Sequence, residues 1–290
     1  MRILVYGAGV IGSLYAVLFA ESNQDVTVYA RGKRLKQLSK EGLKYSDGST
    51  ACTAHVNIIG TLEDQDIYDY IILAVREHQL HAALSELKNN RSRTIVTMVN
   101  SLEDYISWEK ICGQGRILPA FPGAGGSIDD GILHASLTPG IIQKTTFGEI
   151  DGEKTKRSKE FAQILKLAKI PYQIVSDMHA WQLCHLAMVV PLADAYYETD
   201  DPVYVWKDKE LMLTTAKRIK ENLGRLARKG IKLSPAKMKL LRILPTGLLR
   251  FVLTLSYRCN FGDRFMYQHS MKAPDEMKQL HDQFYASMRI

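Results

Sequence analysis

A glycine-rich turn near the start of the chain constrains the fold more than any other feature of the sequence. The turn reads Gly7-Ala8-Gly9-Val10-Ile11-Gly12 and directly follows the apolar, β-prone run Arg2–Tyr6. A helical pattern with apolar positions on one face covers residues 13–21, and a second β-prone run, Asp25–Tyr29, comes next. This order of strand, G-x-G-x-x-G turn, helix and strand predicts a βαβ unit that binds a dinucleotide.

The three glycines of the turn have different purposes in such a site. The first permits a tight turn, the second lets backbone N–H groups approach a pyrophosphate, and the third lets the helix pack close to the strand. The amino end of the helix adds partial positive charge. We therefore expect the cofactor phosphates to lie on Gly7, Ala8, Gly9, Val10, Ile11 and Gly12. A glycine-rich turn without a ligand is the alternative.

The end of the second strand indicates which dinucleotide is bound. NAD sites place a carboxylate there for the ribose 2′-hydroxyl, whereas arginine favours the 2′-phosphate of NADP. Here Arg31 ends the strand, and Lys33 and Arg34 follow it. We predict NADP(H) as cofactor, with Arg31 binding the 2′-phosphate and Lys33 or Arg34 in support. A solvated basic turn is the alternative.

Composition limits the partners and the location of the chain. Its 290 residues carry a formal net charge of +7, which suits anionic ligands, and no nucleic-acid-binding motif is present. Four widely spaced cysteines predict reduced thiols and no metal site. Neither a signal peptide nor a membrane span is recognisable, so we expect a cytoplasmic protein without a membrane or nucleic-acid partner. The most apolar late stretch, 240–255, is expected to be a buried or domain-facing helix.

The pattern of elements changes along the chain. Strand-like and helical runs alternate first, with strands expected at 2–6, 25–29, 69–75, 94–99 and 116–121, and antiparallel additions within 131–150. Helical periodicity then dominates, at 178–197, 206–229, 234–243, 246–258 and 273–288. We predict an α/β fold: a Rossmann-type, doubly wound parallel sheet over 1–172, followed by an all-α domain over 173–290. A ligand is expected in the cleft between them.

The chain resembles the ketopantoate reductase family, whose members reduce 2-dehydropantoate to pantoate with NADPH. The resemblance covers nearly the full length and rests on motifs in the family's order: the glycine turn, Arg31, Val75–Gln79, Asn100, Gly148-Glu149, Trp181, Pro191–Ala193 and Asp275–Met277. It implies an oxidoreductase of pantothenate biosynthesis that uses NADP(H).

The resemblance also implies roles for single residues. Arg76 stands where the family has lysine and would face the cofactor; Asn100, followed here by Ser101 instead of glycine, would reach cofactor and substrate. Glu276 would bind the substrate hydroxyl, and Ser270 or His269 would contact a substrate carboxylate. The alternatives are an arginine at a strand end, a turn asparagine and an acidic residue favoured in the first turn of a helix.

One departure from the family concerns the chemistry itself. The family reads Trp-x-Lys in the first helix of its second domain, and that lysine is taken to donate a proton to the carbonyl oxygen. Here the position is Leu183, and the family's asparagine one turn later is Ala187. Because hydride addition to a ketone needs an acid or cation at the oxygen, His179 or His185 is a candidate replacement, as is a cation such as Lys144 or Arg76.

These observations leave three functions open. The first is NADPH-dependent reduction of a small 2-keto acid, ketopantoate or a close analogue. A homodimer of the chain is a possible assembly. The second is an NADP(H)-binding sensor or regulatory protein that has lost catalysis. The third is a dehydrogenase that acts on a hydroxy acid or an opine-like substrate.

Overall fold

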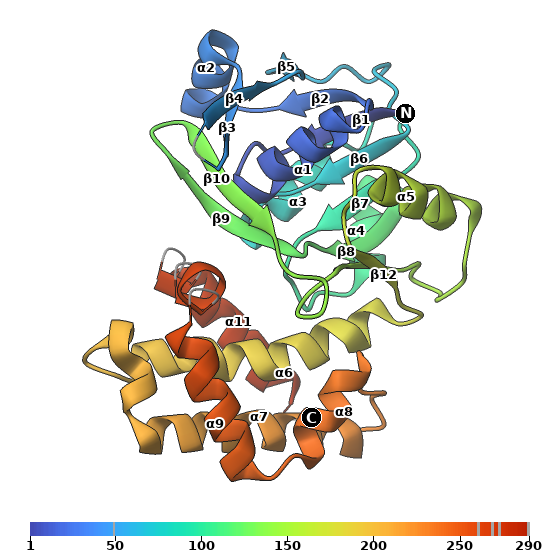
Figure 1. Ribbon diagram of the computed structural model, residues 1–290. Coiled ribbons are helices and arrows are strands. Elements are labelled where there is room, and N and C mark those ends of the chain that lie inside the picture. The colour runs from blue at the N-terminus through green and yellow to red at the C-terminus, as the bar shows by residue number, and fades with distance from the viewer. Residues whose placement is uncertain (49, 260–261, 268–269, 272–273, 289–290) are drawn as a thin grey trace. The chain divides into compact units, whose positions relative to one another are not determined.

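The computed structural model describes residues 1–48, 50–259, 262–267, 270–271 and 274–288. The contacts within the chain divide it into two compact units, Met1–Met178 and His179–Ile290. The first unit is built on two sheets with helices, and the regular elements among the described residues of the second are all helices (Figure 1).

An eight-stranded sheet forms the centre of the first unit. Its strand order is β12-β11-β8-β7-β6-β1-β2-β5, and every neighbouring pair is parallel except β11 with β8. The strands are β1 (Arg2–Tyr6), β2 (Asp25–Tyr29), β5 (Asn57–Ile59), β6 (Tyr70–Leu73), β7 (Ile95–Met98), β8 (Ile117–Phe121), β11 (Thr145–Phe147) and β12 (Tyr172–Ile174). The predicted doubly wound sheet is confirmed.

Helices connect these strands. They are α1 (Val10–Glu21), α2 (Gly32–Glu41), the short 3₁₀ helix η1 (Glu77–Gln79), α3 (Leu80–Glu86), α4 (Tyr105–Cys112) and α5 (Lys156–Leu167). All four residues of β6 and of β7 are buried, as expected for strands covered on both faces. The order reverses at β1, where β2 lies on one side and β6 on the other, and ligands of such sheets bind at the carboxyl ends beside this reversal.

A smaller sheet packs against α1. Its order is β4-β3-β10-β9, made of β3 (Leu43–Asp47), β4 (Thr50–Ala54), β9 (Ala124–Asp129) and β10 (Ile132–Leu137). The hairpin β9–β10 agrees in part with the antiparallel strands expected within 131–150. The β3–β4 hairpin was not predicted. It joins β10 through the pair Leu133 and Tyr45, which are far apart in sequence.

The second unit consists of helices, and no strand occurs among its described residues, in agreement with the predicted all-α region. The helices are α6 (Met178–Tyr197), the short η2 (Pro202–Lys207), α7 (Lys209–Arg228), α8 (Ala236–Ile243), α9 (Thr246–Arg258), the π-helical turn η3 (Gly262–Tyr267) and α11 (Pro274–Ser287). None of the described helices has the length and apolar character needed to cross a membrane.

The helices expected at 234–243 and 246–258 are found as α8 and α9, but the apolar stretch 240–255, expected to be buried or domain-facing, is not buried along its length. The stretch is divided between α8 and α9 at Leu244 and Pro245, because a proline lacks the N–H that would continue the helix. Several of its apolar side chains are also exposed, among them Ile243 and Phe251. The apolar content of the stretch did not reveal which of its side chains remain exposed.

Candidate functional site

The glycine turn has the geometry that a phosphate-binding loop requires. Gly7 has a φ of +111°, and a Cβ added there would lie 2.4 Å from the carbonyl oxygen of Ala74. A Cβ on Gly12 would lie 1.9 Å from the carbonyl oxygen of Gly7. A Cβ on Gly9, by contrast, would meet no atom within 4 Å. The first and third glycines are therefore required by the fold, while the second borders open space.

The amino end of α1 opens onto that space. Gly9 is the N-cap, no side chain caps the helix, and its first turn carries no acidic residue. The N–H groups of a first helical turn have no partner within the helix, and they carry the positive end of the helix dipole. The turn thus offers backbone donors to an anion without a competing carboxylate.

Four side chains form what we call the ribose corner, at the carboxyl ends of β1 and β2. Tyr6 and Tyr29 stack with ring centroids 4.4 Å apart, and both hydroxyls donate to the carboxylate of Glu86 at the end of α3. Burial, followed by the hydrogen bond to Glu86, raises the pKa of both tyrosines, so both remain donors. Arg31 completes the corner, with Nη1 3.4 Å from Glu86 Oε2 and half of its side chain exposed.

The two supporting cations differ in position. Lys33 is exposed. Arg34 turns back to the glycine loop, where its Nε donates to the carbonyl oxygen of Ala8 at 3.2 Å. Its Nη2 is buried and has no hydrogen-bond partner within the described residues, and burial lowers the pKa of its guanidinium. Arg34 therefore braces the loop and keeps one unused donor beside it.

The next two strands of the sheet, β6 and β7, are followed by two residues predicted to face the cofactor. Arg76 follows β6 and is exposed, and its backbone N–H donates to Gln79 Oε1 at 3.4 Å. Asn100 follows β7. Its amide oxygen is buried and has no hydrogen-bond partner among the residues that the structure describes. A buried acceptor without a donor is costly, and a ligand N–H or O–H placed there would satisfy it.

Sequence reasoning missed a buried link between these two strand ends. Ser101 Oγ donates to Glu77 Oε1 at 2.8 Å, and both residues are buried. The backbone N–H of Glu103 donates in turn to Ser101 Oγ at 3.2 Å. The serine that replaces the family's glycine is thus tied to the segment that carries Arg76. In the sequence, the link is signalled only by a glutamate at 77 and a serine at 101, which stand far apart.

The second unit carries the candidate proton donors on α6. His185 is buried, and its ring stacks on Trp181 with centroids 5.2 Å apart and planes 9° apart. His179 is exposed, and Leu183 is buried. The stacking fixes the orientation of the His185 ring, which the sequence could not show.

Another histidine of this unit is paired with a carboxylate. His281 Nδ1 on α11 lies 3.0 Å from both oxygens of Asp194 on α6. Burial raises the pKa of the Asp194 carboxyl, and His281 opposes that shift. The two residues are 87 positions apart, so no local pattern could have predicted the pair.

The remaining predicted substrate residues lie at and before the start of α11. Glu276 is half-buried in its first turn. Ser270 is buried, and its carbonyl oxygen accepts from the hydroxyl of Tyr197 at 2.6 Å. His269 lies outside the described residues. The roles of these residues stay predictions.

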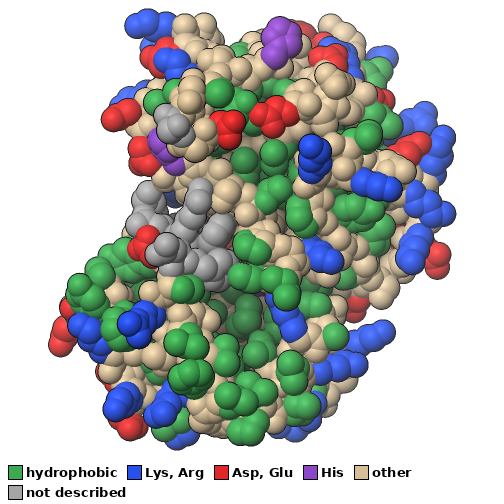
Figure 2. Space-filling view, in the orientation of Figure 1, with side chains coloured by type: hydrophobic (Ala, Val, Ile, Leu, Met, Phe, Trp, Pro, Cys, Tyr) green, Lys and Arg blue, Asp and Glu red, His purple; other side chains and the backbone are tan. Residues whose placement is uncertain are grey.

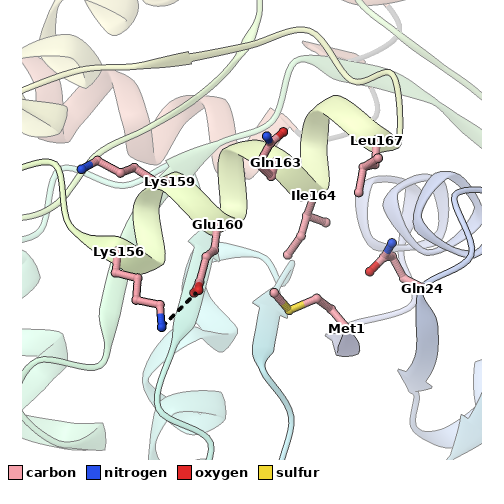
Figure 3. A pocket seen from close by; sticks show the side chains of 8 residues that line it. All are labelled: Met1, Gln24, Lys156, Lys159, Glu160, Gln163, Ile164 and Leu167. Atoms are coloured by element: carbon pink, nitrogen blue, oxygen red, sulfur yellow. Dashed lines mark ion pairs between the residues drawn. The ribbon is translucent and has the colours of Figure 1, made fainter.

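A pocket of the first unit lies elsewhere. It is lined by Met1, Gln24 and residues of α5, including the Lys156–Glu160 ion pair at 3.7 Å (Figure 3). Met1 and Gln24 precede β1 and β2, so the pocket lies at the amino ends of strands whose carboxyl ends carry the glycine turn. It contains none of the predicted site residues. Within the described residues, no group of three His, Cys, Asp or Glu side chains could hold a metal ion.

Comparison with known proteins identifies the family. The model of the family described as ketopantoate reductase PanE/ApbA matches residues 3–152. The chain belongs to the ketopantoate reductase family. The resemblance predicted from the sequence is thereby confirmed, and the family is one of oxidoreductases.

Individual proteins that are similar to this chain agree with this assignment. A 2-dehydropantoate 2-reductase of Mesorhizobium japonicum is 24% identical over 204 residues, which are 62% of this chain and 61% of that protein. The match therefore spans about three fifths of that relative's length. Two solved structures share the fold along almost the whole of both chains. They are 2-dehydropantoate 2-reductase from Geobacter metallireducens (14% identity, 99% and 100% covered, TM-score 0.69) and D-mandelate dehydrogenase with NADH and anilino(oxo)acetate (15% identity, 99% and 98% covered, TM-score 0.66).

Proposed function

We propose that this protein reduces a small 2-keto acid, ketopantoate or a close analogue, with NADPH. The observation that carries the proposal is the glycine turn, which is closed at Gly7 and Gly12 and open at Gly9, beside an uncapped helix end without an acidic residue. Family membership supplies the reaction class, and the name of the Mesorhizobium relative supplies the substrate. The activity would belong to pantothenate biosynthesis.

The choice of NADP(H) over NAD(H) rests on the ribose corner. Arg31 ends the second strand with half of its side chain exposed, and a guanidinium binds phosphate through paired hydrogen bonds. Glu86 supplies a carboxylate at the same place, but two tyrosine hydroxyls already donate to it. We therefore assign the free side of Arg31 to the 2′-phosphate, with the exposed Lys33 in support.

Several residues have roles in the reaction in this proposal. A bound nicotinamide supplies the hydride. Asn100 places its unpaired amide oxygen toward a donor of the cofactor or substrate, and Arg76 faces the cofactor. Glu276 orients the substrate hydroxyl, and Ser270 contacts its carboxylate.

The proton for the new alkoxide comes from a histidine of α6. We favour His185 over His179 because burial and stacking on Trp181 hold its ring in one orientation. A positioned acid of this kind contributes on the order of a hundredfold to ten-thousandfold in rate. Leu183 cannot serve, since it has no ionisable group.

A second candidate function is an NADP(H)-binding sensor without catalysis. The buried Leu183 at the position of the family's lysine favours it, because the cofactor turn is retained while the usual acid is lost. In either function we propose that residues 1–172 bind NADP(H) and that residues 173–290 bind substrate and support a homodimer. We also propose a cytoplasmic location and no nucleic-acid partner.

The test is oxidation of NADPH by the purified protein with ketopantoate, followed by the loss of reduced-nicotinamide absorbance. Binding of NADPH is measured by fluorescence in the same sample. We expect turnover that requires the keto acid. If NADPH binds and a panel of 2-keto acids gives no turnover, the reductase proposal is wrong and the sensor is favoured.

A further inference from the structure

Exposed apolar side chains occur on two consecutive helices of the second unit, and together we call them the α8–α9 surface. It consists of Leu240, Ile243, Leu248, Phe251, Val252 and Leu255, whose exposed fractions range from 42% to 73%. Figure 2 shows hydrophobic side chains gathered over the part of this unit where Figure 1 draws α9, with lysine and arginine side chains around them. Contiguous exposed apolar side chains mark an interaction site more often than single ones do.

Helix α9 has two separate apolar faces. Leu249, Leu253 and Tyr257 are buried and recur every four residues, which is the stripe that packs into the unit. Leu248, Phe251, Val252 and Leu255 follow the spacing i, i+3, i+4 and i+7, which also describes one face of a helix. This second stripe points roughly away from the first and is exposed along two turns.

The stretch of sequence that carries this surface is basic, although acidic residues also lie in or beside the neighbouring elements η2, η3 and α7, among them Asp201, Asp263 and Glu210. The 28 residues from 231 to 258 contain six cations and no acidic residue, although the whole chain has 31 aspartates and glutamates. The cations are Lys232, Lys237, Lys239, Arg242, Arg250 and Arg258. A basic, apolar helical surface of this kind is typical of proteins that lie on anionic membranes.

Aromatic side chains of η2 lie beside α9. Lys207 Nζ is 3.9 Å from the ring centroid of Tyr204, and Arg258 Cζ of α9 is 5.3 Å from that of Trp206. Tyrosine and tryptophan favour the level of lipid headgroups, where one end is apolar and the other is wet. The nearby Asp208 carboxylate accepts from the N–H of Leu211 as the cap of α7, so it is committed to that helix.

We propose that the α8–α9 surface binds the face of an anionic lipid bilayer, with the outer stripe of α9 in the interface and the surrounding cations on the headgroups. A second copy of the chain is a poorer occupant, since a symmetric contact would bring two predominantly basic surfaces together. Nucleic acid would satisfy the cations but not the apolar stripe. The inference is independent of the proposed reaction, and it revises the expectation that the chain has no membrane partner.

The test is sedimentation of the full-length protein with lipid vesicles. We expect binding to vesicles of equal phosphatidylcholine and phosphatidylglycerol, little binding to phosphatidylcholine alone, and weakening by salt. The triple variant Leu248→Gln, Phe251→Gln, Leu255→Gln is expected to weaken binding at least about tenfold, because each side chain loses apolar burial. Ile141→Gln is the matched control, since Ile141 of the first unit is 90% exposed and lies outside the surface.

A double variant tests the contribution of the charges separately from that of the apolar stripe. Lys239→Gln with Arg242→Gln is expected to weaken binding to the anionic vesicles about twenty-fivefold, because each cation contributes about fivefold. Thermal melting confirms that all variants fold, as expected for exposed side chains. Equal binding of the triple variant, or no binding of the wild type, overturns the proposal. A wild-type dimer that the triple variant dissociates in analytical ultracentrifugation would assign the surface to a second copy instead.

Discussion

The glycine turn of the first unit and helix α6 of the second differ in how far they keep the pattern of the family. The turn keeps every glycine of the family pattern, and its geometry is fixed by backbone contacts of Gly7 and Gly12. Helix α6 keeps Trp181 but has Leu183 at the position of the family's lysine. Recognition of phosphate depends on backbone N–H groups and on space, so few substitutions are tolerated there. Proton donation needs one ionisable side chain, which another position of the same helix can supply.

This comparison can first be tested within the turn. We expect Gly12→Ala to abolish measurable NADPH binding and to lower the free energy of unfolding by about 3 kcal/mol, since its Cβ would lie 1.9 Å from a backbone oxygen. Urea unfolding and fluorescence titration measure the two effects. Gly9→Ala is the control: its Cβ meets no protein atom within 4 Å, so stability should stay near wild type while NADPH binding weakens. Equal stability loss in both variants would contradict the assigned roles.

The next test concerns α6. His185→Gln should lower kcat about a hundredfold, the lower limit for loss of a positioned acid, and leave the affinity for NADPH unchanged. Steady-state kinetics with ketopantoate and a binding titration separate the two quantities. His179→Gln should change kcat far less, because His179 is exposed. The opposite ranking would move the proton donor to His179, and two silent variants would move it off α6.

Arg31 links the turn to cofactor choice. Arg31→Ala should weaken NADPH binding about twentyfold, the effect of removing a hydrogen-bonded charge from a phosphate, and should change NADH binding little. Titration with both cofactors gives the ratio of the two dissociation constants. A parallel loss for both would show that Arg31 supports the corner and does not read the 2′-phosphate.

A smaller effect is expected at the link between the two strand ends. Ser101→Gly restores the family's residue but removes the donor to Glu77, so the free energy of unfolding should fall by about 1–2 kcal/mol. Chemical denaturation measures this change. Glu77→Gln is the control: its amide oxygen can still accept from Ser101 Oγ, so its stability should fall less. An unchanged stability of Ser101→Gly would show that the link contributes nothing.

The smallest effect is expected at Glu86. Its negative charge lies beside the group that we assign to the 2′-phosphate, so Glu86→Gln should tighten NADPH binding about threefold and leave NADH unchanged. The amide retains the shape of the side chain for Tyr6 and Tyr29. Weaker NADPH binding in this variant would instead mean that Glu86 mainly holds Arg31 in place.

Local patterns allowed most of the fold to be predicted. The turn, β1, α1 and β2 are contiguous, and the alternation of strands and helices fixes a parallel sheet. The β3–β4 hairpin escaped because it is held by a partner strand 88 positions away, at Leu133 and Tyr45. The site divides in the same manner. Arg31 and the glycines follow from sequence, whereas the approach of Glu86 to Arg31 and of His281 to Asp194 depends on tertiary packing.

The outer face of α9 shows a further limit of sequence reasoning. Apolar content over 240–255 indicated burial, but only one of two apolar stripes can face the interior of a helical unit. Which stripe packs inward is decided by the neighbouring helices and not by the pattern itself. The exposed stripe of Leu248, Phe251 and Leu255 therefore emerged only from the structure.

The most direct test of the retained cofactor site is titration of the wild-type protein with NADPH and with NADH in the absence of substrate. The account predicts saturable binding of both, with the dissociation constant for NADPH at least about tenfold lower, because a charge-assisted contact to the 2′-phosphate contributes on that order. Equal affinities, or tighter binding of NADH, would contradict the assignment of Arg31. Absence of binding to either would contradict the central claim that the glycine turn is a working phosphate site.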